Sequence, residues 1–229
     1  MTTILIADDE SLVREVLASY LGREGFNVVE TGVGSNVVEL VATHEPSLLI
    51  LDVMLPGADG FTVLESLDGA VPVLMLTSRS QEPDRIRGLE LGADDYVTKP
   101  FSPREVTMRV KNILRRTGAA PLSAGDAVIE AGDIVIDVAK RTATVGSRSL
   151  DLTVKEFDLL VFLTRSPSVV FSRADILREV WDSSPEWQDA ATVTVHIRRL
   201  RTKIEEDTAN PKRLLTVWGL GYRFEPWSG

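Results

Sequence analysis

The first hundred residues alternate short apolar segments with segments of helical length, and this alternation restricts the fold more than any other feature of the chain. The candidate strands are Thr3–Ala7, Asn27–Glu30, Ser47–Asp52, Pro72–Thr77 and Asp95–Val97. The segment 11–24 shows the helical spacing between them, with one face formed by Leu12, Val16, Leu17, Tyr20 and Leu21. Strict alternation predicts an α/β fold, a doubly wound five-stranded parallel sheet with helices on both faces.

The pattern changes after a stretch of small, uncharged residues at 119–126, which is typical of a linker. Short candidate strands follow, then three helices that begin at Thr153, Ser172 and near Ala190. Thr153 and Glu156 have the spacing of a capping box. The chain ends in a hairpin around the glycines of WGLG at 218–221. We therefore expect a domain at 1–118, a linker at 119–126 and an α+β domain at 127–229.

Composition excludes several kinds of site. The 229 residues suit two modest domains, and no apolar run approaches the ~20 residues that cross a bilayer. The acidic N-terminus lacks the basic stretch of a signal peptide, so we expect a cytoplasmic protein without a membrane partner. The chain has no cysteine, and His44 and His196 alone cannot form a zinc site. Any metal is therefore expected to have oxygen ligands.

Charge is distributed unevenly between the two halves. The net charge of the chain is −9, which argues against a generally basic nucleic-acid binder. Residues 1–120 hold 11 Lys/Arg and 18 Asp/Glu, a net charge of −7. Residues 121–229 hold 14 and 16, a net charge of −2. The asymmetry suggests two modules with different partners.

Asp52 stands at the end of an apolar strand in the sequence LLILDVMLPGADG, residues 48–60. A run such as LLIL is typical of a strand buried on both faces, which should not carry a charge in its body. Asp52 is then either a capping or turn residue where the strand leaves the sheet, or a side chain held there for chemistry. The strand alone leaves both interpretations open.

Other polar residues follow the ends of neighbouring predicted strands. Asp8 and Asp9 follow the first strand, Thr77 ends the fourth, and Lys99 follows the fifth. Because the carboxyl ends of parallel strands share one edge, these side chains should meet Asp52 there. Crowded carboxylates favour a hard divalent cation, which indicates Mg²⁺. Asp52 can then act as a nucleophile towards a phosphoryl group, and since no GxxxxGK[ST] loop is present, the phosphoryl group must arrive on another molecule.

Residues 1–120 resemble the receiver domain of bacterial two-component response regulators. The resemblance rests on Asp8-Asp9, LDVMLPGADG around Asp52, Thr77, and GADDYVTKPF at 92–101. It implies that Asp52 accepts a phosphoryl group from a sensor histidine kinase. It also implies a Mg²⁺ site, a phosphate contact and a switch pair, with a cis bond at Lys99-Pro100. The implied direct ligands of Mg²⁺ are Asp9, Asp52 and the Met54 backbone carbonyl, and Asp8 would act largely through metal-bound water. Lys99 would contact the phosphate. Thr77 and Tyr96 would form the switch pair.

A cationic helix is predicted in the second half at ATVTVHIRRLRTKIEED, residues 191–207. Its buried stripe consists of Val193, Ile197, Leu200 and Ile204. The outward residues are expected to be Thr194, Arg198 and Arg201 on one flank and His196, Arg199 and Lys203 on the other. Such a helix fits the DNA major groove, but a solvated charged surface explains the same pattern, so the helix alone leaves both open.

Residues 128–226 resemble the winged-helix DNA-binding domain of OmpR/PhoB-type regulators. The motifs are LTVKEFDLLVFL (152–163), SRADILREVW (172–181), TVTVHIRRLRTKIEED (192–207) and LLTVWGLGYRF (214–224). The resemblance implies a winged helix-turn-helix domain that binds double-stranded DNA, with a loop at 182–189 that the family can use to contact RNA polymerase. Trp218 departs from the arginine that many members place in the wing. The residues expected at the DNA are Thr192, Thr194, His196, Arg198, Arg199, Arg201, Lys203, Trp218 and Arg223.

The family forms dimers through its fourth helix, fifth strand and fifth helix. This chain has opposite charges at the matching positions: Arg85 with Glu105, Asp95 with Arg109, and Asp94 with Arg116. Surface pairs contribute only about 0–1 kcal/mol each, so they would set register more than strength. The resemblance thus implies that phosphorylation promotes a homodimer that binds tandem half-sites.

Three functions remain to be distinguished. The first is a phosphorylation-controlled transcription regulator, which is not an enzyme. The second keeps dimerisation and DNA binding but makes the receiver-like domain independent of phosphorylation. The third is a Mg²⁺-dependent aspartyl-phosphate phosphatase, which would need a second acid in a DxD motif, and Asp52-Val53-Met54 lacks that acid.

Overall fold

The computed structural model describes residues 2–77, 82–117, 128–181 and 190–227. The chain forms two compact units, Met1–Leu114 and Arg115–Gly229. The predicted linker at 119–126 lies outside the described residues, as does the loop at 182–189. In the part of the chain that the structure describes, no helix combines the length and apolar character that crossing a membrane requires.

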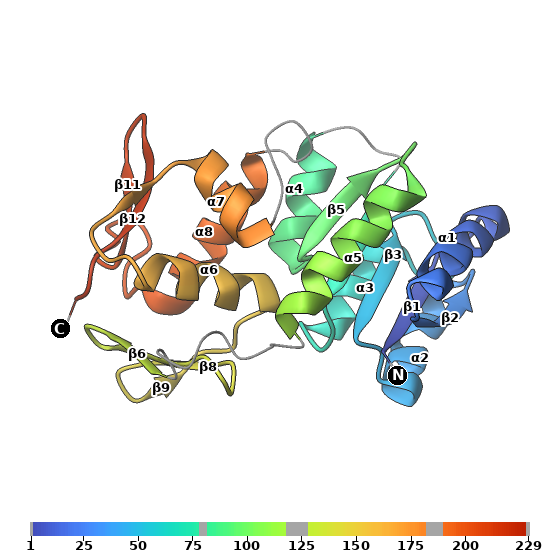
Figure 1. The fold of residues 1–229 in the computed structure, drawn as a ribbon, viewed down its shortest axis with the longest axis horizontal. Helices are drawn as coiled ribbons and strands as arrows, with labels where there is room; N and C mark the ends of the chain where they lie inside the picture. The colour runs from blue at the N-terminus through green and yellow to red at the C-terminus, as the bar shows by residue number, and fades with distance from the viewer. Residues whose placement is uncertain (1, 78–81, 118–127, 182–189, 228–229) are drawn as a thin grey trace. The chain divides into compact units, whose positions relative to one another are not determined.

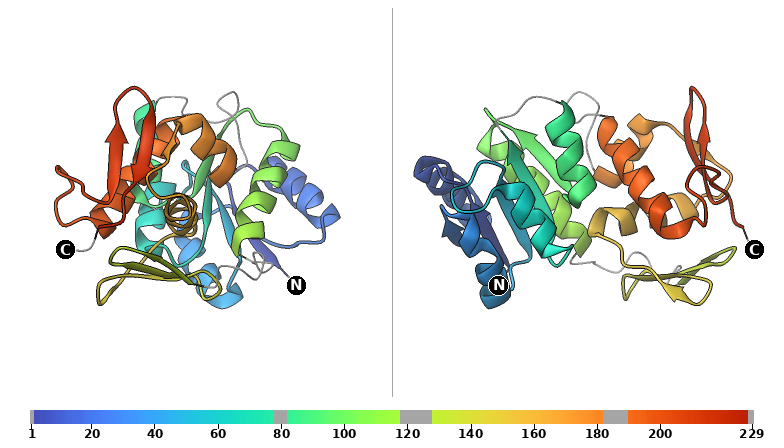
Figure 2. Two further views of the ribbon diagram at one scale, coloured as in Figure 1. Left: turned by 60° about the vertical axis from the view of Figure 1, so that its left-hand side comes forward. Right: turned by 180° about the vertical axis from the view of Figure 1, so that it is seen from behind.

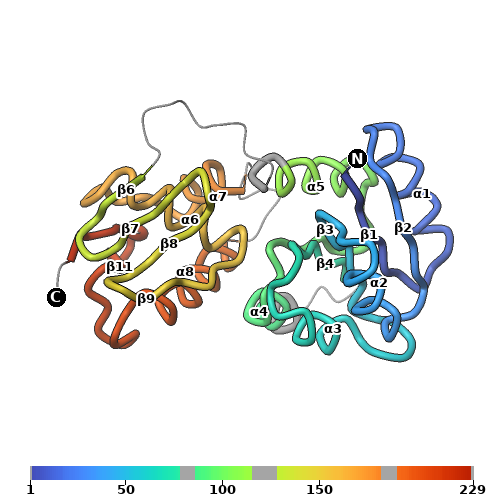
Figure 3. The backbone as a smooth tube through the Cα atoms, turned by 90° about the horizontal axis from the view of Figure 1, so that it is seen from below, coloured from blue at the N-terminus to red at the C-terminus, as the bar shows by residue number. Residues whose placement is uncertain are grey.

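The first unit contains the five-stranded sheet that the alternation predicted (Figure 1 and Figure 3). Its strands are β1 (Thr3–Ala7), β2 (Asn27–Thr31), β3 (Leu48–Asp52), β4 (Val73–Thr77) and β5 (Asp95–Thr98). Every neighbouring pair is parallel, in the order β2-β1-β3-β4-β5. The residues that follow β1, β3 and β5 therefore emerge at one edge of the sheet, with the end of β4 between them.

Helices cover both faces of this sheet (Figure 2). They are α1 (Ser11–Arg23), a 3₁₀ turn η1 (Gly34–Asn36), α2 (Val37–His44), α3 (Gly60–Leu67), α4 (Glu82–Leu91) and α5 (Pro103–Thr117). Leu17 of α1 and Val110 of α5 pack on one face, and Val37 of α2 and Phe61 of α3 pack on the other. Leu12, which was expected on the buried face of its helix, is 70% exposed, because α1 turns Val13 instead of Leu12 towards the core that holds Leu17 and Leu21.

The second unit contains two antiparallel sheets and three helices. The first sheet has the order β6-β7-β8-β9, with β6 (Val128–Ala131), β7 (Ile134–Asp137), β8 (Thr142–Val145) and β9 (Arg148–Ser149). The helices are α6 (Val154–Thr164), α7 (Arg173–Trp181) and α8 (Ala191–Ile204). The second sheet has the order β10-β12-β11, with β10 (Val170–Phe171), β11 (Leu214–Val217) and β12 (Gly221–Phe224). The hairpin of β11 and β12 is the wing, as predicted, whereas β10 was not predicted.

Local signals in the sequence set the helix ends of the second unit. Thr153 and Glu156 make the predicted capping box, with the Thr153 side chain accepting from Glu156 N–H and the Glu156 side chain accepting from Thr153 N–H. Ser172 and Asp175 make the same reciprocal contacts at the start of α7. The predicted apolar stripe of α8 is buried, and it joins α6 and α7 in one core. The winged-helix architecture is therefore confirmed.

Candidate functional site

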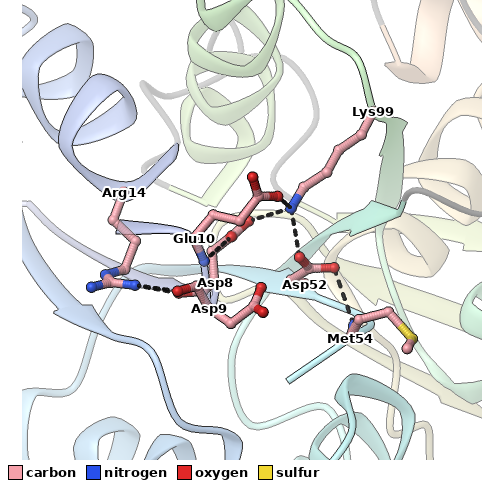
Figure 4. A network of polar contacts seen from close by, with 7 residues as sticks. All are labelled: Asp8, Asp9, Glu10, Arg14, Asp52, Met54 and Lys99. Atoms are coloured by element: carbon pink, nitrogen blue, oxygen red, sulfur yellow. Dashed lines mark hydrogen bonds and ion pairs between the residues drawn. The ribbon is translucent and has the colours of Figure 1, made fainter. Parts of the chain in front are cut away.

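Asp52 ends β3 with its carboxylate buried and engaged at both oxygens (Figure 4). Oδ1 accepts a hydrogen bond from the Met54 N–H at 3.1 Å, and Oδ2 lies 2.6 Å from Lys99 Nζ. The N-cap of the following helix is Asp59, whose side chain accepts from Thr62 N–H. Asp52 is therefore not the cap of α3, and its carboxylate instead faces a lysine from another strand end.

Lys99 joins three carboxylates at the edge of the sheet. Its ammonium lies 2.8 Å from Asp8 Oδ2, 3.1 Å from Glu10 Oε1 and 2.6 Å from Asp52 Oδ2. Burial works against the charged ammonium, but the hydrogen bonds that Lys99 donates to Asp52 and Asp8 outweigh it and raise the pKa of Lys99. Burial raises the pKa of Asp8, although its bond to Lys99 opposes this shift. The sequence predicted this meeting of Asp8, Asp52 and Lys99, and the peptide bond at Lys99-Pro100 is cis as expected.

The acidic loop after β1 has the oxygen donors that a hard cation needs. Asp8, Asp9 and Glu10 can each offer one oxygen, and these atoms lie within 4.8 Å of one another. Oxygen ligands at this spacing fit Mg²⁺. Asp52, an expected ligand, is held by Lys99 and is not part of this group. Glu10 was not predicted, although its position directly after Asp9 in ADDE was a usable signal.

Glycines allow loops to pack against the backbone around Asp52. A Cβ on Gly60 would overlap the Asp52 carbonyl oxygen, and the Gly60 N–H donates to Val53 O at 2.9 Å. A Cβ on Gly34 would overlap the Ala58 carbonyl oxygen, and the Gly34 N–H donates to Pro56 O at 2.9 Å. The loop that carries Asp52 out of the sheet is thus fixed from two sides.

Thr77 and Tyr96, the expected switch pair, belong to neighbouring strands. Thr77 is buried at the end of β4, and Tyr96 is half-buried on β5. Both line a cavity of about 10 Å³ together with Gly88 and Leu89 of α4. The two side chains therefore share a cavity that also borders α4. The neighbouring Ser78 lies outside the described residues.

The expected dimer face contains an ion-pair network within one chain. Arg109 Nη1 lies 2.8 Å from Asp95 Oδ2, and Arg109 Nη2 lies 2.9 Å from Glu105 Oε1. Asp94 Oδ2 accepts from the Val73 N–H at 2.8 Å. Arg109, Asp94 and Asp95 are all buried. The side chains of the other two expected members, at positions 85 and 116, lie outside the described residues.

The outer surface of α8 and the wing carry part of the expected DNA contacts. Thr194 and Arg198 are exposed on α8, and Trp218 is 90% exposed between β11 and β12. Arg201 donates to Leu214 O at 2.9 Å and to Thr216 Oγ1 at 2.8 Å, so it links α8 to the wing. Arg223 Nε lies 2.7 Å from Glu225 Oε1 on the wing.

His196 and Thr192 do not project outward, which corrects the expectation for this flank of α8. Their exposed fractions are 1% and 0%. The His196 ring packs edge-on against Trp181 of α7, with ring centroids 4.9 Å apart, and its Nδ1 lies 3.0 Å from Thr192 O. Burial lowers the pKa of His196 to about 4. The helical spacing identified the buried stripe but not the second flank that α7 covers.

Arg199 and Lys203 point towards α6 rather than away from the core. Arg199 Nε lies 2.7 Å from Glu156 Oε1, and Lys203 Nζ lies 2.6 Å from Glu156 Oε2. Glu156 is 0% exposed, and although burial opposes the shift, Arg199 and Lys203 lower its pKa. The sequence identified Glu156 only as part of a capping box. The structure shows that the same carboxylate also holds two cations of α8.

Both units are similar to known protein families. Residues 4–111 match the response regulator receiver domain, and residues 147–224 match the family described as transcriptional regulatory protein, C terminal. The chain is 42% identical over 228 residues to the probable transcriptional regulator ycf27 of Guillardia theta, covering 97% of this chain and 90% of that one. It is 39% identical over 229 residues to the transcriptional regulatory protein SrrA of Staphylococcus aureus, covering 97% and 95%.

A solved structure supports the same architecture. The crystal structure of the response regulator DrrB, an OmpR/PhoB homologue from Thermotoga maritima, is 29% identical in sequence. It covers 98% of this chain and 99% of its own, with a TM-score of 0.52. The similarity therefore extends over both units.

Proposed function

This chain belongs to the OmpR/PhoB-type response regulators, and from that premise we propose that a sensor histidine kinase phosphorylates Asp52 and thereby controls DNA binding by the second unit. A receiver domain joined to a transcriptional regulatory domain is the architecture of a phosphorylation-regulated transcription regulator. One observation carries the proposal for Asp52. Its buried carboxylate lies at the sheet edge within 2.6 Å of Lys99, beside the carboxylate of Asp8.

The chemistry proposed for Asp52 is a single phosphoryl transfer. A carboxylate oxygen forms a bond to phosphorus, the P–N bond of the donor phosphohistidine breaks, and the imidazole nitrogen leaves with the electron pair. Lys99 is close enough to Asp52 to contact the transferred phosphoryl oxygens and offset their charge. Only one acid of the Asp52-Val53-Met54 segment can take part, which favours storage of the phosphoryl group over repeated turnover.

We propose that Mg²⁺ is the cofactor of this site, because the residues present fit it. Asp9, Asp52 and the backbone carbonyl of Met54 are the proposed direct ligands, and Asp8 would act largely through metal-bound water. Glu10 lies close enough to Asp8 and Asp9 to be added to this set. A bound divalent cation would offset negative charge on the transferring oxygens. Lys99 already binds Asp8, Glu10 and Asp52 through their carboxylates. The ammonium and the cation would therefore share these oxygens.

The signal is proposed to pass from Asp52 to the dimer face. Movement of Thr77 towards a phosphoryl group and inward rotation of Tyr96 would change the packing of β5 against α4, because both side chains border the same cavity as α4. The proposed face carries Arg85, Asp94, Asp95, Glu105, Arg109 and Arg116. Asp95, Glu105 and Arg109 already pair within one chain, so dimerisation would extend or exchange these pairs. A homodimer would bring two winged helices to tandem half-sites, and the loop at 182–189 is the proposed contact for RNA polymerase.

For the DNA surface, the proposal keeps the expected residues that reach the surface and are not held by Glu156. These are the exposed Thr194, Arg198 and Trp218 and the half-buried Arg201 and Arg223. An α-helix with exposed threonine and arginine side chains fits the major groove, and the neighbouring wing is placed to reach the next groove. Arg199 and Lys203 are proposed to act through the position of α8, since Glu156 holds both.

Intact-mass measurement tests the acceptor. The protein is incubated with Mg²⁺ and a small phosphodonor, and the wild type is compared with Asp52→Asn. One phosphoryl adduct on the wild type and none on the variant is the expected result. No adduct on the wild type would favour a phosphorylation-independent regulator, and rapid repeated consumption of the donor would favour a phosphatase.

A further inference from the structure

Arg14 of α1 reaches back to the acidic loop and binds its backbone. Nη1 donates to Asp8 O at 2.6 Å and to Asp9 O at 3.2 Å. Figure 4 shows the guanidinium beside the two aspartates, on the other side of the loop from Lys99. The side chain of Arg14 is 20% exposed, so it is largely enclosed where it makes these contacts.

The surroundings of the guanidinium hold it in this position. A Cβ added to Gly32 would lie 3.1 Å from Arg14 Nη1, so the glycine leaves the room that the guanidinium occupies. Glu30 Oε2 lies 3.8 Å from Arg14 Nε, and the Asp8 N–H donates to Thr31 O at 3.1 Å. Arg14 therefore ties the loop after β1 both to α1 and to the end of β2. Gly32 therefore has a role in this packing.

Arg14 and Lys99 bind different oxygens of the acidic loop, and the difference affects cation binding. Lys99 binds carboxylate oxygens, which a cation would also use. Arg14 binds the carbonyl oxygens of Asp8 and Asp9, so it brings a positive charge next to two carboxylates without occupying their oxygens. Both contacts also fix the backbone from which the two carboxylates extend. Preorganised ligands lose less conformational entropy when they bind an ion.

We propose that Arg14 is a positioning residue that sets the divalent-cation affinity of the acidic loop through its contacts to the Asp8 and Asp9 carbonyls. The inference rests on the proposed function, in which these aspartates bind a divalent cation. Partners that orient metal ligands typically change affinity by about 10- to 100-fold when they are removed. Arg14→Ala should therefore weaken cation binding by about 10-fold or more.

Titration of the full chain with Mn²⁺, with free Mn²⁺ measured by electron paramagnetic resonance, tests the proposal without a phosphodonor. Arg14→Lys keeps the charge, but its side chain ends one bond short of the position of Nη1, the atom that makes both contacts, so it should weaken binding nearly as much as Arg14→Ala. Gly32→Ala keeps the arginine but crowds its guanidinium, and should give an intermediate affinity. Arg23→Ala removes the same charge from the exposed end of α1 and is the matched control, expected to bind like the wild type.

Each outcome separates this inference from the function on which it rests. A wild type that binds no Mn²⁺ would contradict the proposed cation site itself. A wild type that binds Mn²⁺ while Arg14→Ala binds within twofold of it would overturn the role of Arg14 alone. Wild-type affinity in Arg14→Lys, or equal losses in Arg14→Ala and Arg23→Ala, would show that the Arg14 contacts do not set the affinity and would also overturn positioning. If Arg14→Ala does not fold, Arg14→Lys and Gly32→Ala decide the question.

Discussion

Acid should destabilise the second unit of this protein through His196. The ring is 1% exposed and packs against Trp181, and Nδ1 is close to a carbonyl oxygen of its own helix. The charged groups that act on it are Glu156, which favours the imidazolium, and Arg199 and Lys155, which oppose it. Burial outweighs all three and keeps the imidazole neutral.

The size of the effect follows from the pKa of His196, which burial lowers from 6.5 to about 4. The unfolded chain binds the proton more readily, so this stability is fully present above pH 6.5 and is lost as the pH falls towards 4. One pKa unit corresponds to ~1.4 kcal/mol, which gives a total loss of about 3 kcal/mol. About 2 kcal/mol of it should disappear between pH 7 and pH 5. Glu156 also has a lowered pKa, but its contribution is lost only below its ordinary value of 4.5.

Tryptophan fluorescence reports the unfolding of the second unit in the full chain, because all four tryptophans lie after residue 180. Urea unfolding at pH 7 and pH 5 should show a fall of about 2 kcal/mol for the wild type and a much smaller fall for His196→Gln, which cannot titrate. His44→Gln removes the other histidine of the chain, an exposed residue of α2, and should behave like the wild type. An equal fall in the wild type and in His196→Gln would refute the reasoning.

Three further changes test other parts of the structure. Glu156→Gln removes the carboxylate that holds two cations of α8 and should lower the free energy of unfolding of the second unit by about 3 kcal/mol, measured by urea and tryptophan fluorescence. Gly60→Ala forces a Cβ against the backbone of Asp52 and should destabilise the first unit by about 2 kcal/mol in circular dichroism, whereas Gly22→Ala, where a Cβ meets nothing within 4 Å, should not. In fluorescence anisotropy, Arg198→Ala should weaken DNA binding and reduce by about one the slope of log affinity against log salt concentration. Arg199→Ala should lower stability and leave that slope unchanged.

The sequence predicted most of the fold because its strands and helices have clear periods and ends. All five strands of the first unit were located to within one residue at each end. The acidic site was also predictable, since parallel topology alone brings Asp8, Asp52 and Lys99 to one edge. β10 was missed because a strand of two residues shows no period. Arg14 was missed because its partners are backbone oxygens, which no side-chain pattern reveals.

The flanks of α8 show where periodicity stops being informative. An apolar stripe at helical spacing marks the side of a helix that is buried, but it does not say whether polar residues beside the stripe meet solvent or a neighbouring helix. That depends on α6 and α7, which are distant in sequence and which bury His196 and hold Arg199 and Lys203. In the sequence, polar residues that are buried beside the apolar stripe of α8 therefore cannot be distinguished from polar residues that face outward and bind DNA.

Only some of the cationic residues of α8 are available to DNA, and this affects the proposed regulation. The cationic residues of α8 suggest a strongly basic surface in the sequence. However, Glu156 binds Arg199 and Lys203, and residues 121–229 carry a net charge of −2. Ionic contacts to phosphates supply most sequence-independent affinity for DNA, so one winged-helix unit should bind weakly by itself. Two units joined in a dimer bind the second half-site at a high effective concentration, without any new contact to the DNA. Control of dimerisation by Asp52 would therefore change DNA occupancy without any change within a single DNA-binding unit.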